Sequence, residues 1–303
     1  MNTDFPETII PFGGNMSEYQ YTIEQAKDIA QSKSIFFCGI VRNVAKNLER
    51  NILRFQRTTK IFNKSQLFLY ENDSSDNTVD ILKKYESDTI SFISESRKDE
   101  DYILKVGTKE DPHHYYRCQV LSECRNKYMD YIEENKIREK FDYICVVDFD
   151  IRGGWSYNGF LNSLYYLDFL DDAACMSSYG IIADAQQKFK LEEVHHSNYL
   201  FYDTFAFRPI DKDPKIHKLF TSFFNFISFK VGDPLQEVIS NFNGLSIYKS
   251  KYFNHRYQTN QWEEGFVDSE HIHFHQEIRK NGGKIYLNPS MLVSYVDHAS
   301  SEN

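Results

Sequence analysis

The chain has 303 residues, 41% of them hydrophobic and 26% charged, which is an ordinary balance for a globular protein. Its formal net charge of −9 argues against non-specific nucleic-acid binding, because neutralising phosphates requires a basic surface. The longest strongly apolar run, residues 35–41, is far shorter than the roughly 20 residues needed to cross a bilayer, so no transmembrane segment is predicted.

Two features bear on the cellular compartment. The first residues lack a basic stretch followed by an apolar one, so the sequence predicts no secretory signal peptide. The cysteines show no C-x-x-C spacing, and we interpret them as reduced thiols: Cys38, Cys118, Cys124, Cys145 and Cys175. We therefore expect a cytoplasmic protein, with peripheral contact to a membrane left open.

The predicted elements alternate between strands and helices. Residues 1–33 are expected to be an N-terminal extension with a weak helical pattern. Apolar runs then predict strands at 35–41, 66–70, 90–93 and 143–147. Amphipathic spacing predicts helices between them at 44–55, 79–85 and 115–136. This alternation is typical of an α/β sheet, which binds its ligands at the carboxyl ends of its strands.

The second half of the chain is predicted to be mixed. Helices are expected at 159–170 and 270–281, and strands at 174–178, 241–248, 284–287 and 291–295. The last two strands flank Asn288-Pro289, and Gly282-Gly283 ends the second helix, where glycine is favoured. We find no internal repeat and no low-complexity segment.

The triplet Asp148-Phe149-Asp150 directly follows an apolar strand. Side chains alternate along a strand, so both carboxylates are expected on one side of the chain. Two adjacent carboxylates repel unless a positive charge lies between them, and a divalent cation that prefers oxygen ligands meets this need. Such an ion can neutralise a diphosphate leaving group. The alternative is a pair of exposed loop aspartates, because D-x-D triplets are common.

A second polar cluster, ENDSSDNT, follows the strand at 66–70. Carboxylates at this point of nucleotide-binding folds commonly hydrogen-bond a ribose or a base, so Glu71 and Asp73 are candidate donor-binding residues. The alternative is a turn that caps the next helix. Arg42, just past the first strand, and Arg125, within the long helix, are expected to face a phosphate or a carboxylate, or else to be solvated surface arginines.

The order of these motifs resembles that of A-fold glycosyltransferases, especially family-2-like enzymes. The sequence runs from a strand into ENDSSDNT, then ECRNK on a helix, then a strand ending in VVDFD. Near the end, EHIHFHQEIRKNGGKIYLNP is similar to the family's helix, glycine turn and strand leading to a proline. The resemblance covers residues 34–298.

The resemblance implies a single Rossmann-like α/β domain with a mixed central sheet over residues 34–303. It divides into a donor-binding half, 34–152, and an acceptor-side half, 153–303. It further implies a UDP- or GDP-linked sugar donor, a glycan or glycolipid acceptor, and Mn²⁺ or Mg²⁺ as cofactor. Such enzymes commonly act in surface polysaccharide or glycoconjugate synthesis.

The resemblance also assigns roles to particular residues. Asp150 would coordinate the metal, and Asp148 would either coordinate it or hold the ribose. A histidine often follows the family's last strand as a further ligand, and His298 is placed for this role. Asn243-Gly244 would be the acceptor-side loop.

One position departs from the pattern. Inverting members carry an aspartate after the glutamate as general base, whereas this chain has His271 after Glu270. Histidine suits proton transfer at neutral pH, so His271 is retained as a candidate base. The segments YDTFAFR, NG and SEH also resemble fungal capsule-associated α-1,3-mannosyltransferases, which favours retention of the anomeric configuration.

The acceptor side is predicted around residue 270. Glu270 is the preferred acceptor-binding or charge-stabilising carboxylate, and Asp268 is the reserve. Trp262 next to two glutamates would supply an aromatic platform for a sugar ring, with a half-buried surface tryptophan as the alternative. The H-x-H-x-H spacing at 271–275 leaves a zinc site as a further alternative, although a helix would spread these rings around its axis.

Two other functions compete with a glycosyltransferase. A nucleotidyltransferase or another phosphoryl-transfer enzyme also places paired aspartates on a metal after a strand, but needs no element like that at 270–298. A non-catalytic carbohydrate-binding protein would not need Asp148 and Asp150. The sequence contains no GxxxxGK[ST] phosphate loop.

Overall fold

The computed structural model describes residues 5–97, 113–183, 199–210, 227–260 and 267–296. The helices are α1 (Met16–Ser32), α2 (Ala45–Thr59), α3 (Thr78–Tyr85), α5 (His113–Glu134), α6 (Ile137–Lys140), α7 (Tyr157–Phe169) and α9 (Glu270–Lys280), with a 3-10 turn, η2 (Ser250–Tyr252). The longer strands are β1 (Ser34–Val41), β2 (Lys64–Asn72), β3 (Ile90–Glu95), β4 (Tyr143–Val147), β6 (Ala173–Ala183), β9 (Gln236–Ser240), β10 (Leu245–Lys249) and β11 (Lys284–Ser294). Short strands are β5 (Gly154–Trp155), β7 (Tyr199–Phe201) and β8 (Arg208–Pro209).

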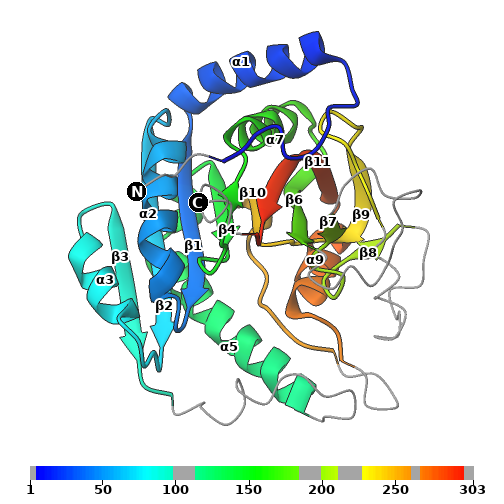
Figure 1. Ribbon diagram of the computed structural model, residues 1–303. Helices are drawn as coiled ribbons and strands as arrows, with labels where there is room; N and C mark the ends of the chain where they lie inside the picture. Colours follow the sequence, from blue (N-terminus) through cyan, green and yellow to red (C-terminus); the bar gives the residue numbers. More distant parts are fainter. Residues whose placement is uncertain (1–4, 98–112, 184–198, 211–226, 261–266, 297–303) are drawn as a thin grey trace.

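All the described strands join one mixed sheet. Its order is β3-β2-β1-β4-β10-β6-β11-β9-β8, with β5 beside β11 and β7 beside β6 (Figure 1). β1 to β4 are parallel, whereas β10 is antiparallel to both β4 and β6. The expected α/β class with a mixed central sheet is therefore confirmed. The carboxyl ends of β1, β2 and β4 meet at one edge, which is where the polar clusters of the sequence lie.

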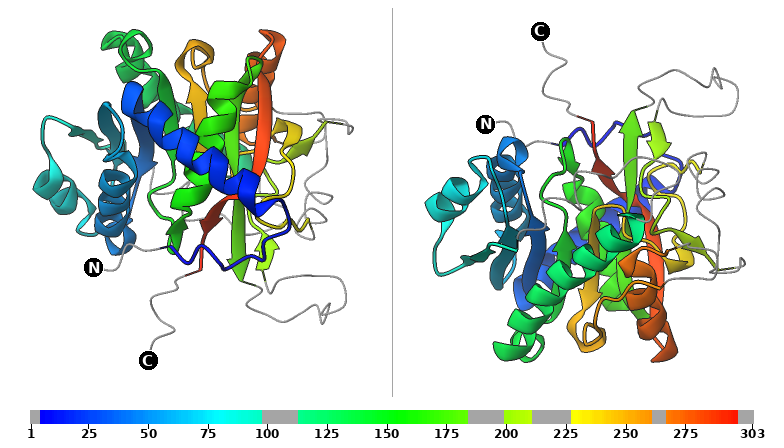
Figure 2. Two further views of the ribbon diagram at one scale, coloured as in Figure 1. Left: turned by 90° about the horizontal axis from the view of Figure 1, so that it is seen from above. Right: turned by 90° about the horizontal axis from the view of Figure 1, so that it is seen from below.

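Helices cover both faces of the sheet. Figure 2 shows α1 crossing α7 on one face, and α5 with α9 on the other. Alternating residues of the central strands supply the two cores: Phe36 and Cys38 of β1 face α5, whereas Ile35 and Phe37 pack with α2 and α7. Burial on both faces explains why these strands are continuous apolar runs in the sequence. No helix within the described ranges is long and apolar enough to span a membrane.

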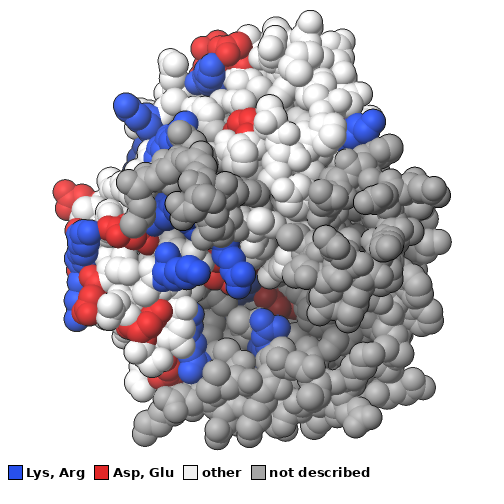
Figure 3. Space-filling model, in the orientation of Figure 1, with Lys and Arg blue, Asp and Glu red and all other residues white. Residues whose placement is uncertain are grey.

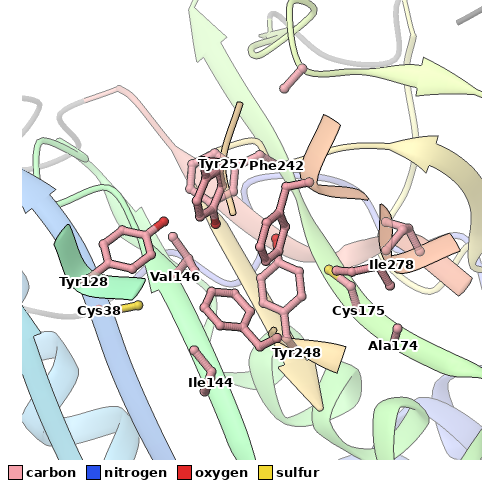
Figure 4. Close-up of a cluster of buried hydrophobic side chains, with 14 of the residues drawn as sticks. Cys38, Tyr128, Ile144, Val146, Ala174, Cys175, Phe242, Tyr248, Tyr257 and Ile278 are labelled. Atoms are coloured by element: carbon pink, nitrogen blue, oxygen red, sulfur yellow. The ribbon is translucent and has the colours of Figure 1, made fainter. Parts of the chain in front are cut away.

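The core beneath α5 and α9 is rich in aromatic side chains. Figure 4 shows Tyr128, Tyr257, Phe242 and Tyr248 gathered beside β4 and β10, with Cys38 and Cys175 at the edges of the cluster. Tyr128 and Tyr257 meet edge to face, with ring centroids 5.7 Å apart. Such ring pairs add roughly 0.5–1.5 kcal/mol beyond the burial of their area. This cluster fixes α5 and α9, which carry two residues of the candidate site.

The N-terminal segment packs on the domain. Thr22, Ile23, Ala26 and Ala30 of α1 are buried, and α1 lies along α7. The side chain of Asn162 in α7 donates to the Thr22 hydroxyl at 2.8 Å. Small residues on this face of α1 allow the close approach of α7.

Two parts of the second half differ from the sequence prediction. The two strands expected around Asn288-Pro289 are one long strand, β11, whose pairing with β6 shifts between Leu287 and Leu292. Proline lacks the N–H that a regular ladder requires, and the Asn288 side chain instead bonds Asn162 and Ser163 at 2.8 Å. The strand β9, which lies between β11 and the two-residue strand β8 and has only two of its five residues buried, was not predicted.

Candidate functional site

The site begins where β4 ends. Phe149 is completely buried and anchors the triplet, Asp148 is partly exposed, and Asp150 reaches solvent. The Asp148 N–H donates to the Gly244 carbonyl at 2.9 Å, which joins the end of β4 to the turn before β10. The two carboxylates therefore flank a buried ring at the sheet edge.

Helix α2 holds the segment that follows. Asn47, Asn51 and Arg54 are buried and spaced by four and three residues, which places them on one helix face. Their side chains donate at 2.9–3.0 Å to four backbone carbonyls, those of Phe149, Asp150, Ile151 and Gly153. These bonds fix the backbone around Asp150 without using its carboxylate.

Arg125 of α5 links Asp148 to the start of α9. Its Nε donates to Glu270 Oε1 at 2.8 Å, and its Nη2 lies 3.5 Å from Asp148 Oδ1. The guanidinium carbon lies 5.1 Å from the ring centre of Phe242 and 5.8 Å from that of Tyr257. The side chain is only 5% exposed, and its Nη1 has no hydrogen-bond partner among the described residues.

Acidic groups outnumber basic groups around Asp148. Burial raises the pKa of Asp148 to about 7, and the Arg125 guanidinium opposes this rise. The neighbouring carboxylates of Asp150, Asp203 and Glu270 add to it. Desolvation also raises the pKa of Asp150 and that of Asp203. Among the described residues, Arg125 is the arginine in contact with these carboxylates and is shared by Glu270 and Asp148, whereas Arg152 and Arg117 act on Asp150 at longer range.

The predicted donor residues differ in how far they are exposed to solvent. Glu71 is 1% exposed and accepts from the Ser74 N–H at 2.8 Å and from the Ser94 hydroxyl. It therefore shapes the turn after β2, which weighs against direct contact with a nucleotide. Asp73 is partly exposed, has a left-handed backbone (φ 51°) and accepts from the Arg97 N–H at 3.0 Å.

Arg42 lies directly after β1, beside this turn. Its side chain is partly exposed, and its Nη1 is buried with no hydrogen-bond partner within the part of the chain that the structure describes. Arg42 thus has donor capacity available at the carboxyl edge.

Asn243 and Gly244 do not form an exposed acceptor loop. Both are buried and have left-handed backbones, with φ of 53° and 90°. Asn243 Oδ1 accepts from the Asp203 N–H at 2.9 Å, and the Gly244 carbonyl accepts from Asp148. A β-carbon on Gly244 would lie 2.4 Å from the Tyr295 hydroxyl, so only glycine fits. This pair positions two carboxylates, and we withdraw it as an acceptor contact.

Asp268 is committed to the fold. Its carboxylate lies 2.9 Å from Arg208 Nη2, and the two side chains are 2% and 1% exposed. The same guanidinium donates to the carbonyls of Phe205 and Phe207. Because the arginine that pairs with Asp268 also bonds two backbone carbonyls, this carboxylate belongs to a structural cluster, and Asp268 is withdrawn from the catalytic set.

His271 is also buried, at 1% exposure. Its ring stacks on Phe242 with centroids 3.9 Å apart, and Tyr257 meets it edge to face. Burial, helped by Arg125, lowers the pKa of His271 well below its ordinary value, so the ring stays neutral. Its enclosed ring nitrogens make it unsuitable as the general base.

The zinc alternative does not hold for the three histidines of α9. His275 uses Nδ1 with the Ser240 hydroxyl at 2.9 Å and Nε2 with the Tyr248 hydroxyl at 2.8 Å, so it is a core residue. His273 lies beside Glu277, away from His275. Across the described ranges, no group of three or more His, Cys, Asp or Glu side chains could hold a metal ion. Trp262 and His298 lie outside the described residues.

The structure adds three residues that the sequence reasoning did not assign to the site. Tyr295 follows β11, and its hydroxyl donates to Asp148 Oδ2 at 3.4 Å. Tyr202 stacks on Tyr295 with ring centroids 3.6 Å apart, and Asp203 follows Tyr202. The segment YDTFAFR was visible in the sequence, but nothing local related it to residues 148–150.

No protein-family model and no curated protein matches the chain. Among solved structures, a mannosyltransferase from Pyrobaculum calidifontis in complex with GDP-Man and Mn²⁺ is similar, with 9% identity and a TM-score of 0.44. The match covers 92% of this chain and 65% of that protein. GalNAc-T7 with UDP, GalNAc and Mn²⁺ has 12% identity and a TM-score of 0.48, with 96% of this chain and 54% of that protein covered.

A glucosyl-3-phosphoglycerate synthase from M. tuberculosis is similar at 10% identity and a TM-score of 0.43, covering 90% of this chain and 74% of that protein. The chain thus spans less than two thirds of the length of the first two proteins. At these identities the likeness concerns the course of the chain and assigns no role to a residue.

Proposed function

We propose that the chain is a metal-dependent glycosyltransferase that transfers a sugar from a UDP- or GDP-linked donor to a glycan or glycolipid acceptor. A place in surface polysaccharide or glycoconjugate synthesis is part of this proposal. One observation carries it: the group of carboxylates at the carboxyl end of β4, held opposite the buried Arg125–Glu270 pair. This arrangement needs a cation and offers donors to an anionic ligand.

Asp148 and Asp150 are the proposed ligands of Mn²⁺ or Mg²⁺, with His298 as a further ligand. Carboxylate oxygens fit such cations, and the excess of negative charge around Asp148 is the condition that a bound cation relieves. When bound, the metal would neutralise the nucleoside diphosphate as it leaves. Because two protein carboxylates alone do not complete a coordination shell, the diphosphate and water would supply the remaining oxygens.

The half of the chain from 34 to 152 is proposed to bind the donor. Arg42 and Asp73 would contact the nucleotide beyond β1 and β2. The unpartnered Nη1 of Arg125 would receive an oxygen of the diphosphate, which satisfies a buried donor and adds a charge-assisted bond.

The half from 153 to 303 is proposed to meet the acceptor. Glu270 is the first residue of α9, accepts from Arg125 and has the Ser269 hydroxyl 3.4 Å from Oε2. We assign it the binding of an acceptor hydroxyl or the stabilisation of positive charge. Trp262 remains the proposed aromatic platform. Retention of the anomeric configuration is the preferred outcome, on the YDTFAFR resemblance alone.

The proposed partners do not include nucleic acid. Figure 3 shows basic and acidic side chains intermixed over the described surface of this face, rather than a continuous basic stripe. All five cysteines are buried thiols, as a reducing compartment would allow. We therefore propose a cytoplasmic location, with peripheral contact to the membrane where the acceptor is a glycolipid.

Thermal unfolding with UDP or GDP, each with and without Mn²⁺, tests the proposal. Ligand at 100 times its Kd should add about 2.7 kcal/mol of stability, and we expect this only when nucleotide and metal are both present. Asp150→Ala should abolish this gain and the turnover of the matching sugar nucleotide while remaining folded. Full activity after exhaustive chelation would contradict the metal, and pyrophosphate release from a nucleoside triphosphate would favour a nucleotidyltransferase.

A further inference from the structure

Asp203 is connected to Asp148 by two independent routes. Along the backbone route, the Asp203 N–H donates to Asn243 Oδ1 at 2.9 Å, and the neighbouring Gly244 carbonyl accepts from the Asp148 N–H at 2.9 Å. The side-chain route runs through rings, because Tyr202 stacks on Tyr295, whose hydroxyl bonds Asp148. Asp203 is thus held against the end of β4 although 55 residues separate it from Asp148 in the chain.

Buried polar side chains make this connection rigid. Asn243 donates to Asn241 Oδ1, and Asn241 donates to the Ser177 hydroxyl and the Ser178 carbonyl at 2.8 Å. The Ser178 hydroxyl returns a bond to the Asn243 carbonyl at 2.8 Å. All four side chains of this network are completely buried. A satisfied polar network in a low-dielectric core fixes one geometry, so the position of Asp203 is specified rather than incidental.

The carboxylate of Asp203 is only half used by the fold. Oδ1 accepts from the Ala206 N–H at 3.2 Å, whereas Oδ2 has no hydrogen-bond donor among the described residues. No arginine or lysine pairs with it there, unlike Asp268 and Glu270. Desolvation raises its pKa, and the charge of Glu270 adds to this rise. Asp203 Oδ2 is an acceptor without a donor on a partly exposed residue, within the electrostatic influence of Arg125, and it is therefore suited to a ligand that brings hydroxyl groups.

We infer that Asp203 contacts the substrate, its Oδ2 accepting a hydrogen bond from a hydroxyl of the sugar that is transferred. This inference rests on the proposed function and deepens it. Asp148 and Asp150 would hold the metal and, through it, the diphosphate of the donor. Asp203 would contact the sugar of the donor. A carboxylate accepts from neutral hydroxyls, so this residue distinguishes sugars by where their hydroxyl groups lie.

The variant Asp203→Asn tests the inference. Asparagine retains the oxygen that accepts from Ala206, but presents an N–H₂ donor where the sugar would meet an acceptor. UDP and GDP binding with Mn²⁺ should stay close to wild type, whereas kcat/KM for nucleotide release from sugar nucleotides should fall by about 10- to 100-fold. The ranking of UDP-glucose, UDP-galactose and GDP-mannose as donors should also change.

The matched control is Asp172→Asn, a surface aspartate paired with Lys284 at 2.9 Å, which should leave both measurements unchanged. If Asp203→Asn does not fold, Asp203→Ser takes its place, since the hydroxyl still caps this turn. A kcat/KM near wild type would overturn the inference. Loss of nucleotide binding in step with turnover would also overturn it and put Asp203 on the metal. Absence of nucleotide binding by the wild-type protein would instead refute the proposed function.

Discussion

Two buried arginine–carboxylate pairs stand near each other in the chain and differ in what surrounds them. Both pairs are enclosed, with side chains 1–2% exposed for Arg208 and Asp268 and 4–5% exposed for Glu270 and Arg125. The Arg208 guanidinium also donates to the carbonyls of Phe205 and Phe207. Glu270, two residues later, pairs with Arg125, whose remaining groups face Asp148 or lack a partner. The first pair is complete within the protein. The second pair leaves one buried donor, Arg125 Nη1, without a partner among the described residues, and this difference is the basis of the proposed site.

Replacing each arginine with methionine should give the largest difference in turnover between the two pairs. Arg125→Met leaves Glu270 and Asp148 without a cation, so we expect sugar-nucleotide turnover to fall by about 10²–10³-fold. It should also cost about 3–5 kcal/mol of stability, because an unpaired charge remains buried. Arg208→Met should lose stability on the same scale but keep kcat per folded molecule. Urea unfolding and a nucleotide-release assay measure both, and an equal loss of kcat in the two variants would contradict the distinction.

Replacing the carboxylate of each pair by the corresponding amide tests the same difference with a smaller change in structure. Glu270→Gln keeps the shape and an acceptor for Arg125 but removes the charge. We expect kcat to fall by about 10²-fold with nucleotide affinity little changed, if Glu270 assists proton transfer. Asp268→Asn should leave kcat unchanged and lower the unfolding temperature. If Glu270→Gln retains more than about half of the wild-type kcat, Glu270 has no part in the mechanism.

The sequence predicted those parts of the site that depend on local pattern. An apolar strand followed by D-F-D is a local feature, so Asp148 and Asp150 could be placed at the sheet edge before any coordinates. The partner of Glu270 is 145 residues away in the chain, and that of Asp268 is 60 residues away. The residues around 268–270 contain no pattern that predicts which carboxylate has a purely structural ion pair. That depends on which helix and strand pack against each carboxylate.

The same limit explains the misplaced assignments. Asn243-Gly244 was expected to be the acceptor-side loop on the resemblance alone, yet this turn is completely buried beside β6 and β10. Asp203 could not be related to Asp148 because β5, α7, β6 and β7 lie between them in the chain, and Asn243, which connects them, comes later still. In the fold, strong apolar runs such as β1 and β4 were predicted, whereas the half-buried strand β9 was not.

The donor side offers a comparison between one buried acid, Glu71, and one partly exposed acid, Asp73. Asparagine, like aspartate, tolerates the left-handed backbone at position 73, so Asp73→Asn should add no backbone strain. We expect its affinity for the matching nucleotide to fall by about tenfold, or ~1.4 kcal/mol. Glu71→Gln should leave the affinity unchanged, since both of its oxygens serve the turn and β3. Calorimetric titration with Mn²⁺ present measures both, and unchanged affinity in both variants would move the nucleotide elsewhere.

The last comparison concerns a pH dependence of stability, which we expect at Asp148 beside the Arg125–Glu270 pair and not at the Arg208–Asp268 pair. Burial raises the pKa of Asp148 to about 7 in the folded protein, against roughly 3.9 in an unfolded chain. The folded state therefore binds more protons between these values, and stability falls as the pH rises from about 4 to about 7. Asp268, by contrast, lies 2.9 Å from the Arg208 guanidinium, which balances its charge.

Asp148→Asn removes this titrating group and should flatten part of that decline in the metal-free protein. Asp150 and Asp203 also have a raised pKa and act in the same direction, so some of the slope should remain. Urea unfolding at half-unit pH steps in the presence of a chelator measures the difference, with Asp172→Asn as the exposed control. The variant should equal the wild type in slope below pH 4 and exceed it in stability at pH 8. Parallel curves for wild type and Asp148→Asn across the whole range would show that Asp148 is already ionised without a metal, and the charge imbalance that motivates the cation would then have to lie with Asp150 and Asp203.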